Sequence, residues 1–373
     1  MSDPATLLRL IRTEGVGPQT FRRLRERFAS PEEALDALPD LARQGGRRGG
    51  LRSPSLAEIR RELDRHAELG ASLLFLGDAD YPPLLALLPD APPVIAVKGD
   101  IALLRRPVVA VVGARNASAN GRRIAADIAG DLAAAGHPVV SGLARGIDAA
   151  AHAAALREGG TIAAIPGGLD VVYPPEHRDL QARIAEAGAV IAEAPPGTAP
   201  LARHFPKRNR IIAGLALGVV VIEAALRSGS LLTARYALDY GRELFAVPGS
   251  PLDARARGGN DLIRQGAGLV ESAADILANL PLTPGAPFAG ARQPALRPGF
   301  AEPAAAPPET SEVLDRARRE IRKLLSASPV SVDELSRHCQ FSTPVIVAVL
   351  AELELAGRLE TLPGNRVCLL SEC

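Results

Sequence analysis

Two glycine-bearing loops each carry an arginine in a position where an anion could bind. The first loop contains Gly113 and Arg115, and the second contains Gly142 and Arg145. Each loop follows a short apolar run and precedes a helical pattern. This is the arrangement at the carboxyl ends of parallel strands, where loop amides and helix starts favour anions. We expect both arginines on one edge of a sheet, which we call the strand-end rim. The alternative is that the glycines serve only the turns and the arginines are only solvated.

The segment 204–210, HFPKRNR, is the most informative for binding. It combines one aromatic ring, three cations and an amide, namely Phe205, Lys207, Arg208, Asn209 and Arg210. Positive charge at the start of a helix is unfavourable unless an anion is present, so the segment favours a phosphate. The alternative is that Arg208 and Arg210 pair inside the domain with Glu193 and Glu223.

Catalytic and cofactor chemistry is not favoured by the motifs. Gly113 is followed by Arg115 where a dinucleotide fingerprint needs its second glycine, and the chain has no P-loop. Ser141, Asp148 and His152 lie within one loop and helix without a nucleophile elbow, so we expect Asp148 and His152 to brace that loop. The histidines have no metal spacing. The sequence predicts no catalytic residues, no cofactor and no metal.

The elements that must position these residues form an α/β domain. Apolar runs, each followed by a turn and a helical pattern, lie at 108–112, 138–140, 161–165, 189–192, 218–222 and 243–247. They predict at least six strands in one doubly wound, mostly parallel sheet. Residues 70–97 are expected to be a connector that enters the sheet.

The N-terminal region reads as a small helical domain. Two short helices joined by Gly15-Val16-Gly17 resemble a helix-hairpin-helix, whose hairpin amides hold a nucleic-acid phosphate without reading sequence. The alternative is a helical packing domain without DNA contact.

The C-terminal region reads as a winged helix. Residues 311–373 show three helical patterns and a hairpin, after a proline- and alanine-rich segment that predicts a disordered linker at 281–310. The third helix has no Lys, Arg, Asn or Gln, and its Glu352 and Glu354 would repel a DNA backbone. We therefore favour a protein contact for this helix, in cis or in trans.

Composition sets the remaining expectations. The 373 residues carry a net charge of +1, so any nucleic-acid site must be a local patch. The three cysteines show no metal-ligand spacing, which favours a reduced compartment. Neither a signal peptide nor a membrane span is apparent, and we expect a soluble, cytoplasmic protein that does not engage a membrane.

Taken in order, eight motifs resemble the DNA-processing protein A family, also called DprA or Smf. The motifs are VVGARNASANG, SGLARGIDAAAH, PGGLDVVYP, EAPPG, FPKRNRIIAGL, VVVIEAALRSGSLLTARYAL, GRELFAVPG and GGNDLIRQGA. They cover about residues 80–275, and the flanking domains match less specifically. His177, Ala192, Ala194 and Ala216 depart from the usual pattern beside the rim.

The resemblance implies an extended Rossmann-like domain that binds single-stranded DNA, forms a homodimer and loads the RecA recombinase during natural transformation, without catalysis. It implies a helical domain related to SAM and helix-hairpin-helix modules at 1–70, the Rossmann-like domain at 71–280, the linker at 281–310 and the winged helix at 311–373. By position, the DNA-binding residues it implies are Gly113, Arg115, Ser118, Ser141, Gly142, Arg145, Gly146, Gly167, Gly168, Phe205, Lys207, Arg208, Asn209 and Arg210.

Our interpretation of the residues themselves is that loop amides hold phosphates together with Arg115, Arg145, Lys207 and Arg210, and that a base stacks on Phe205. One alternative is a lysine-decarboxylase-like nucleotide phosphoribohydrolase, which shares a Pro-Gly-Gly strand end but needs Gly-Thr and a glutamate near it. Another alternative is an adaptor that binds only protein.

Overall fold

The computed structural model describes residues 3–47, 49–281, 311–326, 328–362 and 366–370. The chain divides into two compact units, residues 61–286 and residues 1–60 with 287–373, and each is described by itself. The predicted linker at 281–310 lies, apart from Pro281, outside the described residues.

A nine-stranded sheet forms the larger unit. Its strands are β1 (Ser72–Phe75), β2 (Val94–Gly99), β3 (Val109–Gly113), β4 (Val139–Ser141), β5 (Thr161–Ile165), β6 (Ala189–Ala192), β7 (Gly218–Ile222), β8 (Glu243–Ala246) and β9 (Gly268–Leu269). The spatial order is β1-β2-β6-β5-β4-β3-β7-β8-β9, and all neighbours from β6 to β9 are parallel. The prediction of a doubly wound, mostly parallel sheet is confirmed.

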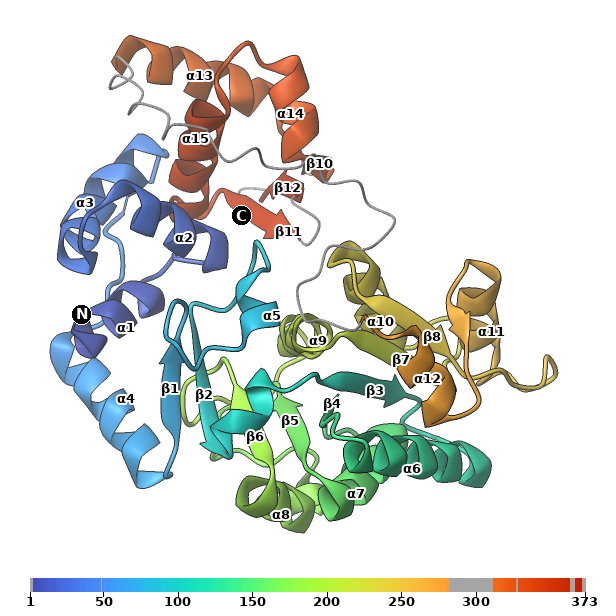
Figure 1. The fold of residues 1–373 in the computed structure, drawn as a ribbon. Helices are drawn as coiled ribbons and strands as arrows, with labels where there is room; N and C mark the ends of the chain where they lie inside the picture. Colours follow the sequence, from blue (N-terminus) through green and yellow to red (C-terminus); the bar gives the residue numbers. More distant parts are fainter. Residues whose placement is uncertain (1–2, 48, 282–310, 327, 363–365, 371–373) are drawn as a thin grey trace, which may run out of the picture. The chain divides into compact units, whose positions relative to one another are not determined.

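Helices cover both faces of this sheet (Figure 1). They are α5 (Pro83–Ala86), α6 (Ala119–Ala134), α7 (Ile147–Glu158), α8 (Arg178–Ala187), α9 (His204–Leu215), α10 (Ser230–Asp239), α11 (Arg257–Arg264) and α12 (Ala273–Asn279), with α4 (Leu56–Glu68) before β1. In β3, Val109 and Val111 pack into the cluster that includes α6 and α7. Ala110 and Val112 pack into the opposite cluster with α9 and α10. Such burial stabilises by about 1.5–3 kcal/mol for each valine.

Strands β1 and β2 correct the sequence interpretation, which took residues 70–97 as a connector. β2 pairs antiparallel with both β1 and β6. Proline pairs around this region obscured two strands that extend a parallel sheet by an antiparallel edge, a common arrangement in mixed sheets. The two-residue edge strand β9 was also missed, because it is too short for a periodic signal.

The strand order reverses at β3. The chain leaves β3 through α6 toward β4, yet its other neighbour is β7, which comes much later in the sequence. In open α/β sheets, ligands bind outside the carboxyl ends of strands at such a switch point. The fold therefore places a crevice between the loop after β3 and the loop after β7.

The smaller unit combines the N-terminal helices with the C-terminal domain. Its elements are α1 (Pro4–Arg12), α2 (Pro18–Arg27), α3 (Pro31–Gln44), α13 (Ser311–Leu324), β10 (Val330–Ser331), α14 (Val332–His338), α15 (Thr343–Leu355), β11 (Leu359–Leu362) and β12 (Arg366–Leu369). The strands form a sheet in the order β10-β12-β11. Three helices and this sheet confirm the predicted winged helix.

Helix α15 is buried on more than one side. Its apolar residues Val345, Ile346, Val349, Leu350 and Leu353 form the core of the winged helix, while α2 and α3 pack against the same helix. A helix that is hydrophobic all round must be covered all round. The sequence PVIVAVLAELELAG therefore requires a second covering layer, and the N-terminal helices supply it.

We predict that deleting residues 287–373 loosens α2 and α3 while the nine-stranded sheet stays folded. The deletion exposes the apolar surface that α15 covers, whereas the sheet keeps its own core. Hydrogen exchange should speed up in α2 and α3 and stay unchanged in α6. Equal protection of α2 and α3 in both proteins would contradict the prediction.

Candidate functional site

The loops after β3 and β4 are held together by a close approach of their backbones. The amide of Ile147 donates to the carbonyl of Ala114 at 3.2 Å. Gly146 has φ +79°, and a Cβ there would lie 2.2 Å from that carbonyl oxygen, so only glycine fits. This approach brings Arg115 and Arg145, both exposed, to one small pocket, as the sequence predicts.

Phe205, in the first turn of α9, supports the guanidinium of Arg115. The Arg115 Cζ lies 5.2 Å from the ring centroid, a cation–π contact. Tyr173 meets the same ring edge-on, with centroids 5.7 Å apart and planes at 69°. The ring is therefore partly occupied, and the plane of Arg115 extends the surface on which a base could stack. This refines the expectation that a base stacks directly on Phe205.

The side chain of Arg208 is buried and binds main-chain carbonyl groups inside the domain. It is 6% exposed, and its Nη1 donates to the carbonyls of Gly142 and, at 2.9 Å, Ala164. Its Nε donates to Asn209 Oδ1 at 3.1 Å. Burial lowers the pKa of Arg208 to about 10, against the attraction of Asp148. Arg208 thus ties the ends of β4 and β5 to α9, and its burial leaves it unavailable to a phosphate, contrary to the expectation from the sequence.

Arg210 is also internal. Its Nη2 donates to both Glu193 carboxylate oxygens at 2.6 and 2.8 Å, and its Nη1 donates to the Asp90 carbonyl. The alternative of internal pairing therefore holds for Arg210, which pairs with Glu193. It does not hold for Arg208, which binds main-chain carbonyls, and Glu223 has other partners.

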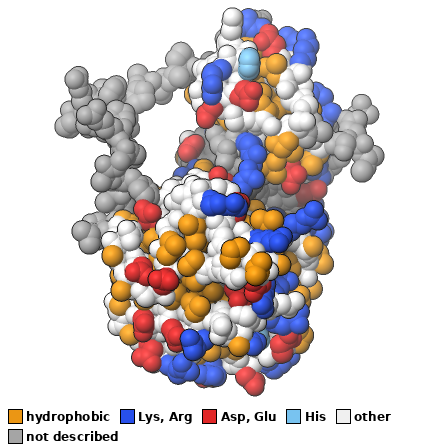
Figure 2. Space-filling model, turned by 90° about the vertical axis from the view of Figure 1, so that its right-hand side faces the viewer, with side chains coloured by type: hydrophobic (Ala, Val, Ile, Leu, Met, Phe, Trp, Pro, Cys, Tyr) orange, Lys and Arg blue, Asp and Glu red, His pale blue; other side chains and the backbone are white. Residues whose placement is uncertain are grey.

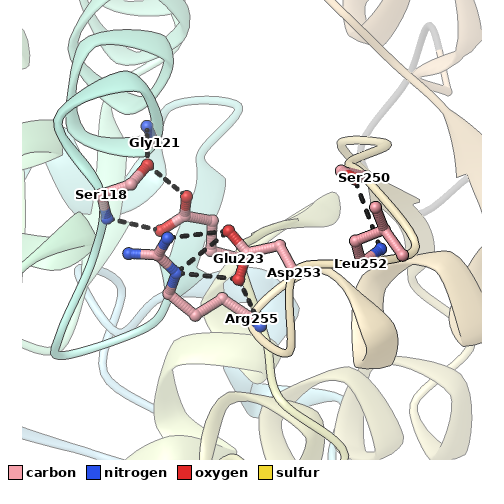
Figure 3. Close-up of polar contacts among 7 residues, drawn as sticks. All are labelled: Ser118, Gly121, Glu223, Ser250, Leu252, Asp253 and Arg255. Carbon is pink, nitrogen blue, oxygen red and sulfur yellow. Dashed lines mark hydrogen bonds and ion pairs between the residues drawn. The ribbon is translucent and has the colours of Figure 1, made fainter.

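Glu223 fills the start of α6 (Figure 3). Its carboxylate accepts from the Ser118 amide at 2.8 Å and from the Ser118 hydroxyl, whose oxygen in turn accepts from the Gly121 amide at 2.9 Å. Glu223 has φ +51°, a conformation that a non-glycine residue keeps only when its surroundings enforce it. The helix start that holds a phosphate in dinucleotide-binding folds is thus occupied by the protein's own carboxylate. The missing fingerprint agrees with this geometry.

Asp148 braces the loop after β4. Buried at the start of α7, it accepts from the amides of Gly142 at 3.1 Å and Ala144 at 3.3 Å. Burial raises its pKa, and the nearby Arg208 opposes that change. The Ser141 hydroxyl is buried and donates to the Val111 carbonyl at 2.6 Å. The side chains of Asp148 and Ser141 therefore both make hydrogen bonds within the protein that hold the loop in place.

His152 is a second brace and is held neutral. Its Nε2 accepts from the Leu143 amide at 3.2 Å, and Leu143 has φ +53°. Its Nδ1 lies 2.8 Å from the Thr161 hydroxyl, which donates elsewhere, so Nδ1 carries the proton. Burial lowers the pKa of His152 to about 3. The prediction that Asp148 and His152 brace this loop is confirmed.

Gly167 and Gly168 are buried beneath the loop after β6. The amide of Gly168 donates to the Thr198 carbonyl at 3.0 Å, and a Cβ at Gly167 would lie 2.7 Å from the same oxygen. A Cβ at Gly168 would lie 2.6 Å from the Pro195 carbonyl oxygen. These glycines permit loop packing, and the structure places neither on an exposed surface.

A cavity of about 630 Å³ opens at the switch point between β3 and β7. Its size suits a nucleotide-sized ligand. The lining residues that carry polar side chains are Arg115, Asn116, Asp148, Arg208, Asn209, Arg227, Ser228, Ser230, Thr233 and Arg255. The cavity also touches Gly113, which lies against the carbonyl of Ile222.

Arg227 and Arg255 were missed by the sequence interpretation. Arg227 lies in the loop after β7, and Arg255 is held by Asp253, whose carboxylate accepts from the Arg255 amide and guanidinium (Figure 3). Arg227 lies within the motif EAALRSGSLLT, in which only the serines at the helix start drew attention. Arg255 belongs to no recognisable motif, because only the three-dimensional path of the loop after β8 brings it to the cavity.

Lys207 and Arg145 are two further exposed cations near the cavity but do not line it. Lys207 is exposed in the first turn of α9 but lines neither pocket. Arg145 Nε lies 3.7 Å from Glu176, an exposed pair that contributes little to stability. Both side chains can reach a polyanion that passes over the rim.

Among the described residues, no group of histidine, cysteine and acidic side chains is arranged to hold a metal ion. No helix in the described ranges is long and apolar enough to cross a membrane.

Fold and site together define an α/β protein with a cationic, aromatic-supported cavity at its sheet switch point, flanked by a helical domain and a winged helix. Residues 72–281 match the model of DNA recombination-mediator protein A, and the chain belongs to this family. Residues 2–64 match the DprA-like N-terminal HHH domain, and residues 302–365 match the DprA winged helix domain.

Three relatives illustrate the relationship. Protein Smf of Synechocystis is 33% identical over 394 residues, covering 98% of both chains. The X-ray structure of DNA processing protein A from Streptococcus pneumoniae covers 76% of this chain and 100% of its own, with 38% identity and a TM-score of 0.63. The Helicobacter pylori structure, described for its unique single-stranded DNA binding mode, covers 56% of this chain and 94% of its own, with 30% identity and a TM-score of 0.51.

We predict that acid destabilises the larger unit through His152. Its folded pKa of about 3 lies below the unfolded value of 6.5, so its contribution to stability is complete above pH 6.5 and is lost as pH falls toward 3. The unfolding free energy should fall by up to about 1.4 kcal/mol per pH unit in that window. Denaturant titrations of the wild type and His152→Gln should differ in this slope. Equal slopes would contradict the prediction.

Proposed function

We propose that the protein is a non-enzymatic single-stranded DNA-binding protein whose strand lies along the strand-end rim. Arg115, supported by Phe205 at the mouth of the 630 Å³ cavity, is the observation that carries the proposal. Base stacking on aromatic and guanidinium planes, beside a cationic groove, is how proteins hold single strands without reading sequence.

The contacts divide between the cavity and the rim. Arg227 and Arg255 surround a space that accepts one nucleotide, while Arg145 and Lys207 are placed to neutralise backbone phosphates outside it. The amides of the loops after β3 and β4 add donors. Arg208 and Arg210 act indirectly, because Arg208 holds the loop after β4 and Arg210 holds Glu193 after β6.

Catalysis has little support in the site. Ser141, Asp148 and His152 are all buried and hydrogen-bonded to the protein. The phosphoribohydrolase alternative needs a reactive carboxylate after the Pro-Gly-Gly strand end. Here Asp170 follows, and it binds Arg65 at 2.7 Å and the Gly197 amide at 2.7 Å. We therefore favour binding without turnover.

We further propose that the protein acts in the cytoplasm and delivers bound strands to the RecA recombinase during natural transformation. The support is the family itself, whose model is described as a recombination mediator. A protein that holds strands mainly through phosphates leaves base edges available for pairing. The Rossmann-like domain, 71–280 in this proposal, would carry the binding, and the flanking domains would regulate it.

A homodimer through the β9 edge is part of the same proposal. β9 is an edge strand, and hydrophobic side chains gather on the face that carries this edge (Figure 2). Leu269 in β9 is 54% exposed and Leu238 in α10 is 59% exposed. An exposed strand edge with apolar neighbours is a template for pairing with a second copy.

We predict that Arg115→Ala, Arg145→Ala and Lys207→Ala each weaken single-strand binding about five- to tenfold and flatten the salt dependence by about 0.7 in log–log slope. Arg157→Ala is the matched control, because this exposed arginine lies in the last turn of α7, away from the rim. Fluorescence anisotropy across a salt series measures both quantities. Normal folding with unchanged affinity and slope in all three variants would place the site elsewhere.

We predict that Leu269→Lys and Leu238→Glu convert a dimer into monomers and reduce affinity for long strands more than for short ones, because linked sites bind one strand together. Arg157→Ala again serves as control. Sedimentation at micromolar concentration gives the mass. A wild-type monomer, or affinity independent of strand length, would refute the dimer.

A further inference from the structure

The last turn of α15 lies against the N-terminal hairpin. A Cβ at Gly15, whose φ is +79°, would be 3.0 Å from the Leu355 Cα and carbonyl oxygen. A Cβ at Gly17 would be 3.1 Å from Glu354 Oε1. Figure 1 shows α15 alongside α2 and α3. The hairpin Gly15-Val16-Gly17 is therefore covered by the helix that a winged helix usually presents to DNA.

Glu354 places a carboxylate at the start of α2. Gly17 is the cap residue of this ten-residue helix, and the Thr20 hydroxyl in its first turn donates to Glu354 Oε2. A helix start favours a negative charge, because its free amides and its dipole both point outward. Glu354 thus places its carboxylate where the start of α2 favours an anion.

Arg23, one turn further along α2, is an incompletely satisfied partner. Its Nη1 is buried and makes no hydrogen bond among the described residues, while its Nη2 reaches Gln19 at only 3.5 Å. Burial lowers the pKa of Arg23 and raises the pKa of Glu354, although the two groups attract each other. A carboxylate with two oxygens leaves this guanidinium short of acceptors, and a phosphate group offers more of them.

A second contact holds the same cover. Glu352 is 2% exposed and binds Arg318 of α13 at 2.7 and 2.9 Å, and Arg318 Nη2 reaches Gln44 of α3 at 3.3 Å. A Cβ at Gly45 would be 1.9 Å from the Glu352 carbonyl oxygen. Both glutamates, which were expected from the sequence to repel a DNA backbone, thus bind residues of the same chain. The third helix therefore makes a protein contact in cis.

We propose that α15 is an autoinhibitory cover of the N-terminal hairpin, with Glu354 standing in for a nucleic-acid phosphate. The hairpin, with Arg23, binds a sugar–phosphate backbone only when α15 withdraws, and the Thr20 hydroxyl serves only to hold Glu354 in the covered state. The proposal concerns a site separate from the strand-end rim and does not depend on it.

The test uses the full-length protein and Glu354→Lys, which places a cation against Arg23 and opens the cover. Glu360→Lys is the matched control, because it makes the same charge change at an exposed position of β11 in the same domain. Hydrogen exchange in α2 and α15 reports opening, and anisotropy with a 40-nucleotide single strand across a salt series reports binding. We expect faster exchange, about fivefold tighter binding and a slope steeper by about one phosphate in Glu354→Lys only.

Two further substitutions show which site causes the increase in single-strand affinity of Glu354→Lys. Arg23→Ala in the Glu354→Lys background should abolish it, whereas Arg115→Ala in that background should lower overall affinity and leave the gain intact. If Arg115→Ala has no effect, the strand-end proposal fails while the hairpin proposal stands. If the open variant gains nothing, or keeps its gain without Arg23, the hairpin proposal fails.

Thr20→Val provides an independent route if Glu354→Lys does not fold. It removes the hydroxyl that donates to Glu354 with little change of shape, and we expect faster exchange in α15 and tighter binding in the same direction. Unchanged exchange would show that Glu354 does not hold the cover and would overturn the proposal. Opening without tighter binding would overturn it as well.

Discussion

The buried guanidinium of Arg208 is the interaction on which the rest of the site depends. It joins the carbonyls at the ends of β4 and β5 to α9, and it lies beside Asp148, which braces the loop after β4. Burying a charge is tolerated only when its hydrogen-bond partners are supplied, and here main-chain carbonyls supply them. A single internal cation therefore fixes the loop after β4, whose outer cation Arg145 remains exposed, and this loop in turn contacts the loop of Arg115 through Gly146 and Ile147. The division between inner and outer arginines is the organising feature of the rim.

Acidic side chains complement this division by filling helix starts. Glu223 occupies the start of α6, and Glu354 occupies the start of α2. Each removes an anion site that a helix would otherwise offer. In the larger unit, the anion-binding capacity that remains lies at the exposed arginines and the cavity at β3 and β7. That distribution suits a polymer passing over a surface better than a nucleotide held at a helix end.

The sequence predicted the central sheet and both flanking domains because their signals are local. Unbroken β-branched runs such as 108–112 are typical of strands buried on both faces, and the turn residues that follow each run mark the rim. It did not separate inner from outer cations in HFPKRNR, since Arg208 and Lys207 differ only in which side of α9 faces the sheet. Charge alone suggested internal pairing of Arg208 and Arg210 with Glu193 and Glu223 as an alternative, and the structure shows such a pair only for Arg210 and Glu193. Arg255 lines the cavity because of the path of the loop after β8, and no local sequence pattern predicts that path.

The contact between Gly146 and the Ala114 carbonyl also constrains how this surface can diversify. Because the two loops touch backbone to backbone, neither can gain or lose a residue without parting from the other. Insertions are tolerated where loops have no such contact. The loop after β6 also touches a neighbouring backbone, at Gly167 and Gly168, so changes in the breadth of the binding surface must enter through the loop after β8, at 247–256. The arginine pair then stays fixed while that border varies.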